Sequence, residues 1–437
     1  MRTFQQLNDC LIVYIILYLY NIVNEQAKKP GMDVRIMGEM EKSNLTDPFA
    51  YMKALAAIAV FIMHVQVFSG MYGYRISESN WFMKASGHGA VWVFFFLSGY
   101  FNIKGFLGAD PRYRLEPKGI LAFYIRRFIK VLFPVWCFYL IALTISEPSF
   151  LQIFPETLWH LLTFTYSGEP GCTSIAATWY VSSLTWLYFF TPLIAWICRK
   201  LERSDRKIHI IAFILLAALL GLAERVFLLI SGVDWTQGVC VPFYCNLDLY
   251  ICGAFAYLLS KRIRFSPGAM VPYALSLIVY SLLLLIHNRI YYLADHDVRY
   301  MIIHGYFMPT VYIAVMSIVC ILVQSAGYRY QAVSPGCVRR NPFRLIDAFS
   351  LISFQFYLIH NMVLFHLSTF LTGETGAEYN RNMLIFGFIL SIPLSLLFKR
   401  AATFRLPGEG AAKYSSGIAY KDTVSDRVYG DENGSAT

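Results

Sequence analysis

The sequence predicts an all-α protein that crosses a membrane many times. Of its 437 residues, 57% are apolar and only 15% are charged, whereas soluble domains are about 45–50% apolar and about 25% charged. Apolar runs long enough for transmembrane helices recur along the chain, and no strand-like alternation accompanies them. These observations exclude a soluble globular enzyme, a disordered chain and a disulfide scaffold.

Each long apolar run is expected to be a helix, because hydrocarbon leaves backbone polar groups no partner outside their own segment. The expected spans are 50–70, 88–106, 120–145, 178–198, 208–231, 240–260, 269–289, 301–324, 349–371 and 382–399. We therefore predict a polytopic bundle of about ten transmembrane helices.

This predicted membrane domain covers 48–400, between an N-terminal extension (1–47) and a tail (401–437). The extension holds an apolar segment, Cys10–Val23, that is too short to span comfortably. It is expected either to lie at the membrane interface or to precede the true start of the protein. The tail is polar and rich in Gly and Ser, which predicts a disordered cytoplasmic end.

The distribution of Lys and Arg sets the expected orientation. One set of alternate loops carries 16 of these cations and the other set carries 5. Because cationic loops stay on the cytoplasmic side, both termini are expected to be cytoplasmic. The same bias accounts for the net charge of +10, so no nucleic-acid partner is expected. No spacing typical of a metal site occurs, and none is expected.

The first expected span contains two ionisable residues, Lys53 and His64, which are 11 residues apart. That spacing is close to three helical turns, so both side chains project from one face. His64 lies about 21 Å along the helix from Ala50, in the outer part of the membrane. One interpretation is a core histidine with a lysine that extends to the interface. The other is a functional pair, because ionisable residues within spans are costly.

The third expected span begins with three cations, Arg126, Arg127 and Lys130, ahead of Pro134. In an α-helix Lys130 would share a face with Arg126 and neighbour Arg127. These cations either anchor the helix at the cytoplasmic interface or bind phosphate, whose oxygens match the arginine fork. In the aromatic second span, Ser98 and Gly99 indicate close helix packing or a functional break.

Charged residues also occur in the outer half of the expected bundle. Glu224, Arg225 and Asp248 form either a structural ion pair within the membrane or one wall of an acceptor pocket. His360, within the ninth span, is a second candidate for polar contact with a substrate. The stretch Asp295–Asp297, near His287 and His304, is interpreted as a solvated loop rather than a metal site.

These segments, in this order, resemble the acyltransferase-3 family of bacterial membrane O-acyltransferases. The family's Arg-x10-His matches Lys53-x10-His64, its F-F-x-L-S-G-F matches Phe94–Tyr100, and its R-R-x-x-R matches Arg126–Lys130. Similar stretches follow at Trp179–Pro192, Leu249–Gly253 and Phe354–His360. The resemblance covers about 48–399. It departs at Lys53 and Lys130, which replace arginines, and at Leu184, near which many members carry a glutamate.

The resemblance implies transfer of an acyl group, expected to be acetyl, from cytosolic acyl-CoA to a hydroxyl of a surface or lipid-linked carbohydrate. It implies acyl-CoA as co-substrate with no bound cofactor, contact with membrane lipids, and a place in the bacterial plasma membrane. His64 would be the general base or the acyl acceptor. The predicted donor-binding residues are Lys53, Arg126, Arg127 and Lys130. The predicted acceptor or supporting residues are Ser98, Trp179, Glu224, Arg225, Asp248, Tyr357 and His360.

Two other functions remain open at this point. The first is that of a transporter or flippase for a glycolipid, and the second is that of a membrane assembly subunit that has lost its chemistry. No internal repeat of the kind that transporters use is visible. The replacement of two family arginines by lysines keeps open the interpretation that the chain is an inactive subunit.

Overall fold

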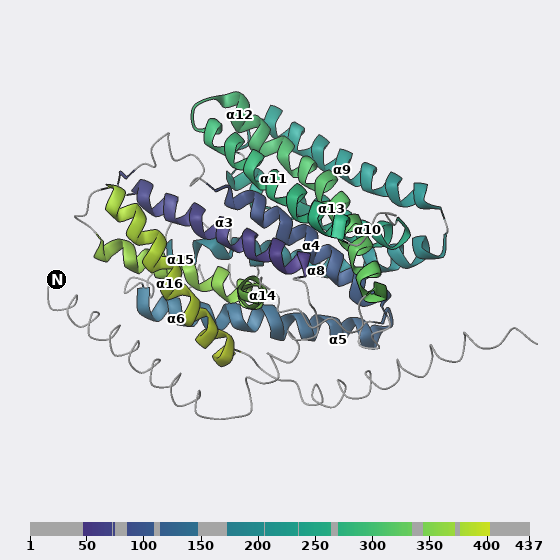
Figure 1. Cartoon of the computed structure of the whole chain (residues 1–437), viewed down its shortest axis with the longest axis horizontal. Helices are drawn as coiled ribbons and strands as arrows, with labels where there is room; N and C mark the ends of the chain where they lie inside the picture. Colours follow the sequence, from purple (N-terminus) through teal and green to yellow (C-terminus); the bar gives the residue numbers. More distant parts are fainter. Residues whose placement is uncertain are drawn as a thin grey trace, which may run out of the picture.

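The computed structural model describes residues 47–71, 73–74, 85–108, 114–146, 173–204, 206–234, 236–263, 270–333, 344–371 and 376–402. Within these ranges the chain is helical and contains no β-strand (Figure 1). The Cys10–Val23 segment and the tail beyond Ala402 lie outside the described residues. The all-helical fold class is confirmed for the rest.

Seven described segments are long and apolar enough to cross a membrane. They are α3 (Pro48–Met71), α4 (Gly87–Leu107), α8 (Trp179–Arg203), α9 (Lys207–Ile230), α11 (Met270–Ala294), the segment Val298–Ala326 and α16 (Gly376–Ala402). The segment Val298–Ala326 lies in a continuous run of α12 (Val298–Ile302), the π-helix η6 (Ile303–Phe307) and α13 (Met308–Val333). The chain is therefore a multi-pass membrane protein, while ten spans and cytoplasmic termini remain predictions.

The remaining expected spans are also helical but are shorter or interrupted. The third runs without a break through α5 (Pro117–Arg127), the π-helix η2 (Phe128–Leu132) and α6 (Phe133–Ser146). The sixth begins at α10 (Leu247–Arg262), later than the expected residue 240, because short turns η4 (Thr236–Cys240) and η5 (Tyr244–Asn246) flank Pro242. The ninth divides into α14 (Arg344–Ser350) and α15 (Ser353–Phe370), and η3 (Thr173–Thr178) precedes α8.

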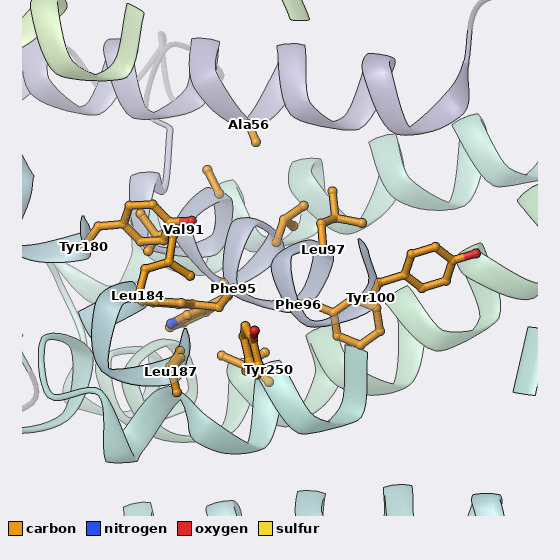
Figure 2. Packing of buried hydrophobic residues seen from close by; sticks show 14 of the residues in the cluster. Ala56, Val91, Phe95, Phe96, Leu97, Tyr100, Tyr180, Leu184, Leu187 and Tyr250 are labelled. Atoms are coloured by element: carbon orange, nitrogen blue, oxygen red, sulfur yellow. The ribbon is translucent and has the colours of Figure 1, made fainter. Parts of the chain in front are cut away.

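Helix α4 lies at the centre of the bundle and packs against α3, α8, α10 and α13. Figure 2 shows its side chains between Ala56 of α3, Leu184 of α8 and Tyr250 of α10. Glycines make the contact with α10 possible: a Cβ on Gly99 would lie 2.0 Å from the Tyr250 carbonyl oxygen, and one on Gly253 would lie 2.0 Å from that of Phe96. The two backbones therefore touch, as the small residues in the sequence predicted.

Helices α9, α11 and α16 lie at the periphery. They bury the smallest shares of their apolar segments and expose large side chains such as Leu220, Ile286 and Ile389. Exposed leucine and isoleucine are what lipid-facing helices present, because the surrounding acyl chains are equally apolar. Most polar residues of interest lie among the inner helices α3, α4, α8, α10, α13 and α15, while Arg225 of α9 and His287 of α11 are buried on the inner faces of peripheral helices.

Candidate active site

The structure brings together two predicted site residues that are 296 positions apart in the chain. His64 of α3 and His360 of α15 have ring centroids 4.9 Å apart, and the His360 Nε2 lies 3.1 Å from the His64 Nδ1. His360 is fully buried, whereas His64 is half-buried. The sequence placed both residues within spans but did not predict their contact.

Backbone carbonyls fix the protonation pattern of this pair. The His360 Nδ1 lies 2.9 Å from the Phe356 carbonyl oxygen, and the His64 Nδ1 lies 2.9 Å from that of Val60. A carbonyl only accepts hydrogen bonds, so each Nδ1 carries the proton of its neutral ring. The single His64 Nδ1–H is then shared between the Val60 carbonyl oxygen and the His360 Nε2, and the His64 Nε2 keeps its lone pair. That nitrogen can act as a base or as a nucleophile.

Aromatic side chains hold His360 in place. The Phe356 ring stacks on it at 5.7 Å, and the Tyr357 ring lies 5.9 Å away. The Tyr357 hydroxyl donates to the Ala177 carbonyl, which anchors α15 to the turn before α8. A rigid His360 in turn restricts the orientation of the His64 ring.

Two more predicted residues lie next to this aromatic group. The Tyr357 ring is 5.5 Å from that of Tyr180, and the Ser98 side chain lies near the Tyr180 hydroxyl. Trp179 is half-buried beside Tyr180. Ser98, Trp179, Tyr357, His360 and His64 thus form one cluster, in which Tyr180 is a link that the sequence did not single out.

Two of the predicted donor-binding cations contact the same turn of α4. The Lys53 Nζ lies 5.6 Å from the centre of the Phe101 ring, and Arg127 donates to the Asn102 side-chain oxygen. The Arg127 guanidinium also lies 5.4 Å from the ring centroid of Phe123 and 5.1 Å from that of Tyr188. These cation–π contacts hold the guanidinium at a fixed position.

Asn102 extends this contact into a buried polar network. Its side-chain nitrogen donates to the Tyr250 hydroxyl at 2.6 Å, and that hydroxyl lies 2.6 Å from the Thr191 hydroxyl. The network joins α5, α4, α10 and α8. No sequence pattern singled out Asn102, Tyr250 or Thr191 as functional, because single polar residues in an apolar helix carry no spacing signal.

The helix turn that carries Lys130 is wider than an α-helical turn. The π-helix η2 begins at Phe128 and contains Lys130, and its wider turn changes the residue spacing along the helix face. Lys130 is exposed, while Arg126 is half-buried. The sharing of one face by Arg126 and Lys130 stays a prediction.

A cavity of about 300 Å³ adjoins the cationic segment. Apart from Arg127 and Thr185, its walls are apolar or aromatic. They comprise Tyr124, Phe128, Leu132, Trp136, Tyr188 and Phe189. Arg127 therefore combines a place in the polar network with access to this cavity.

The charged residues of α9 and α10 form a buried ion pair. The Arg225 Nη2 lies 2.7 Å from the Asp248 Oδ2, and both side chains are almost completely buried. The guanidinium also donates to the carbonyl oxygens of Tyr306 and Cys245 and to the Thr310 hydroxyl. Glu224 is half-buried and accepts from the Cys245 thiol. This geometry is that of the structural ion pair which the sequence offered as one alternative.

The loop between α11 and α12 has a local role. Asp297 caps α12 by accepting from the Arg299 backbone N–H, and it also pairs with the Arg299 side chain at 2.6 Å. These hydrogen bonds hold the pKa of Asp297 below its ordinary value. No group of His, Cys, Asp or Glu among the described residues has the geometry of a metal site.

His287 and His304 instead point into the bundle. The His287 Nε2 lies 2.7 Å from the His304 Nδ1, and the His287 Nδ1 lies 2.9 Å from the Tyr312 hydroxyl. All three side chains are buried. The sequence placed the two histidines near each other but did not predict their hydrogen bond or the contribution of Tyr312.

Comparison with known proteins decides the family. A family model described as an acyltransferase domain matches residues 49–400. This chain belongs to the acyltransferase-3 family. The match covers the whole bundle from α3 to α16 and confirms the resemblance seen in the sequence. No curated protein matches the chain, and no solved structure does. The chain is thus a membrane protein of an acyltransferase family.

Proposed function

We propose that this protein transfers an acyl group, expected to be acetyl, from cytosolic acyl-CoA to a hydroxyl of a cell-surface or lipid-linked carbohydrate. The single observation that best supports this function is the His64–His360 pair, in which the Val60 carbonyl fixes the His64 tautomer, the buried His360 restricts its ring, and Nε2 is left basic. Family membership supports the acyltransferase class. The proposed location is the bacterial plasma membrane.

The donor is proposed to bind with its phosphates at Lys53, Arg126, Arg127 and Lys130. Lys53 and Arg127 converge on one turn of α4, and both lie at the cytoplasmic end in the predicted orientation. Lys53 and His64 are 11 residues apart on α3, which is about 16 Å along the helix. The pantetheine arm would cover this separation and bring the thioester to His64.

Two reactions are compatible with the His64 Nε2. As a general base, it takes the proton of the attacking hydroxyl while the new ester C–O bond forms. The C–S bond then breaks, and the proton passes to the departing thiolate. As an acyl acceptor, Nε2 attacks the thioester carbon itself, releases the thiolate, and afterwards yields the acyl group to the hydroxyl. In both reactions the His64 ring gains positive charge, which its Nδ1–H shares with His360.

The remaining predicted residues have supporting roles in this proposal. Ser98, Trp179 and Tyr357 line the region next to His360, where an acceptor or the acyl chain would lie. Glu224, Arg225 and Asp248 hold α9, α10 and η6 together.

The test is turnover of acetyl-CoA by the purified full-length protein, with His64→Gln as the variant. Glutamine retains hydrogen-bonding capacity but has no basic nitrogen. General-base assistance is typically worth about 10²–10⁴-fold, so thioester turnover should fall at least about a hundredfold while CoA affinity is retained. The matched control is His366→Gln, which alters a half-buried histidine on α15 and should retain normal turnover.

Other outcomes would reject the proposal. Near-normal turnover in His64→Gln would make His64 a core histidine. If the wild-type protein does not turn over acetyl-CoA, whether or not it binds this donor, a glycolipid transporter or an inactive assembly subunit would be favoured.

A further inference from the structure

A second group of histidines lies next to the proposed active site and has no part in the mechanism above. It consists of His88 at the start of α4, His287 of α11 and His304 of η6, together with Tyr312 of α13. We call these four residues the histidine chain. His304 and Tyr312 both hydrogen-bond to His287, and the His88 ring centroid lies 5.8 Å from that of His304.

The histidine chain begins beside His64. Met63, the neighbour of His64, packs against Gly87, the neighbour of His88, so closely that a Cβ on Gly87 would lie 2.5 Å from the methionine sulfur. This contact places the turn of α3 that carries His64 against the first turn of α4, which carries His88. His88 is half-buried, whereas His287 and Tyr312 are fully buried.

The backbone of α4 is shaped around the histidine chain. A Cβ on Gly89 would lie 2.3 Å from the Tyr312 hydroxyl oxygen and 2.4 Å from the His287 Nδ1. Trp92 stacks on His287 from the next turn, with ring centroids 5.4 Å apart. Burying three polar side chains in this way carries a desolvation cost that apolar residues of similar size would not have.

The hydrogen bonds of the histidine chain can reverse direction without moving a heavy atom. If the Tyr312 hydroxyl donates to the His287 Nδ1, then the His287 Nε2–H donates to the His304 Nδ1. In the opposite direction, the His304 Nδ1–H donates to the His287 Nε2, and the His287 Nδ1–H donates to the Tyr312 oxygen. Proton transfer along the chain reaches this neutral state when the His304 Nε2 gives up its proton and the Tyr312 oxygen takes one up. Such a chain can accommodate a positive charge on a neighbouring imidazole, because its dipoles reorient toward that charge.

The acyl-acceptor form of the proposed reaction needs a second base. While the His64 Nε2 carries the acyl group, it has no lone pair for the proton of the incoming hydroxyl. We infer that His88 takes that proton in the second step, and that His304, His287 and Tyr312 position and stabilise the resulting His88 imidazolium. This inference rests on the proposed function and on its two-step form.

In the first step the N–C bond to His64 forms, the C–S bond breaks, and the thiolate leaves and takes a proton from water. In the second step the hydroxyl oxygen attacks the acyl carbon, its proton passes to His88, and the C–N electron pair returns to His64. His88 then releases its proton to water, which restores the starting state.

Two assays separate the steps without knowledge of the acceptor. Exchange of isotopically labelled CoA into acetyl-CoA reports the first step alone. Hydrolysis of acetyl-CoA, with water as the acceptor, requires both steps. Purified full-length His88→Asn should retain wild-type exchange and lose hydrolysis by at least about a hundredfold. His64→Gln should lose both activities.

Variants deeper in the histidine chain test the positioning role. His304→Asn and Tyr312→Phe should also lower hydrolysis while leaving exchange intact, with the smaller effect for Tyr312→Phe because Tyr312 is two hydrogen bonds beyond His304 along the chain. The control is His296→Asn, which alters an exposed histidine in the loop between α11 and α12 and should change neither activity.

Three results would overturn the inference. The first is wild-type hydrolysis in His88→Asn, which would leave His88 without a role. The second is an equal loss of exchange and hydrolysis in that variant, which is the mark of a purely structural residue. The third is a wild-type protein that hydrolyses acetyl-CoA without exchange, which would exclude the two-step form but keep the proposed function. A wild-type protein with neither activity would reject the proposed function itself.

Discussion

The ion pair of Arg225 with Asp248 and the pair of His64 with His360 are both buried polar contacts between inner helices, but their hydrogen bonding differs. The Arg225 guanidinium donates four hydrogen bonds to groups of the protein, and the Asp248 carboxylate also accepts from the Leu249 N–H. In the histidine pair, every ring nitrogen except the His64 Nε2 has a hydrogen-bond partner within the part of the chain that the structure describes.

This difference separates a structural role from a chemical one. A side chain whose hydrogen-bonding groups are all used within the protein has little capacity left for a substrate. A basic nitrogen that its neighbours orient but do not bind can still form a bond to one. Burial and charge alone would not have distinguished the two pairs, because both are rare and costly within a membrane.

The largest effect is expected from Asp248→Ala. Removing one partner of a buried ion pair leaves an uncompensated charge, which typically costs about 3–5 kcal/mol of unfolding free energy. The variant should therefore unfold at a much lower temperature or denaturant concentration in detergent. Glu224→Gln, on the neighbouring half-buried side chain, is the control and should have a small effect. Normal stability with lost acyl transfer would instead assign Asp248 to an acceptor pocket.

A smaller effect, on rate rather than stability, is expected from His360→Leu. When His64 becomes positively charged during the reaction, its hydrogen bond to His360 becomes charge-assisted, and such bonds are worth about 1.5–3 kcal/mol. Acetyl-CoA turnover should fall roughly 10- to 150-fold, while the KM for acetyl-CoA and the unfolding midpoint stay near wild type. A parallel loss of stability would place this pair in the same class as Arg225 and Asp248.

The smallest effect, on CoA affinity, is expected from substitution of Lys130 in the cationic segment. Arg127 is partly satisfied by Asn102, whereas Lys130 is exposed. Lys130→Ala should weaken CoA binding about tenfold, near the low end for a charge-assisted bond. Lys130→Arg should bind as well as wild type or better, because it supplies a fork for phosphate. Calorimetric CoA affinity that is unchanged in both variants would leave Lys130 as an interfacial anchor.

The sequence was sufficient to predict the helical segments and several of the site residues. Apolar runs are local features, so every expected span contains a helix within the described residues. His64 and His360 stood out because ionisable residues within spans are rare. Their contact could not be predicted, because it joins α3 to α15, 296 residues apart in the chain, and depends on tertiary packing.

Other parts of the site left no usable pattern in the sequence. The π-helix at Phe128–Leu132 changes the spacing of the cationic segment, and α-helical periodicity cannot reveal it. Asn102 contacts a predicted residue through a single hydrogen bond and Tyr180 through a single ring contact, and such contacts have no sequence signature. The role of Gly89 could not be predicted either, because this glycine makes room for the distant side chains of His287 and Tyr312.

The contact between the backbones of α4 and α10 has a consequence for substrate selection. Because glycines bring the two backbones into contact at the crossing, neither helix can slide or rotate without the other. The position of α4 in the bundle is therefore fixed. This helix contacts the cations at Asn102 and the histidine chain at Gly89, thirteen residues away, or about 20 Å. Helix α4 therefore sets a fixed distance between the cations and the histidine chain. In the proposed reaction, this fixed distance would exclude a donor whose arm is too short to reach from the phosphate-binding cations to the reacting nitrogen, however well its charges matched.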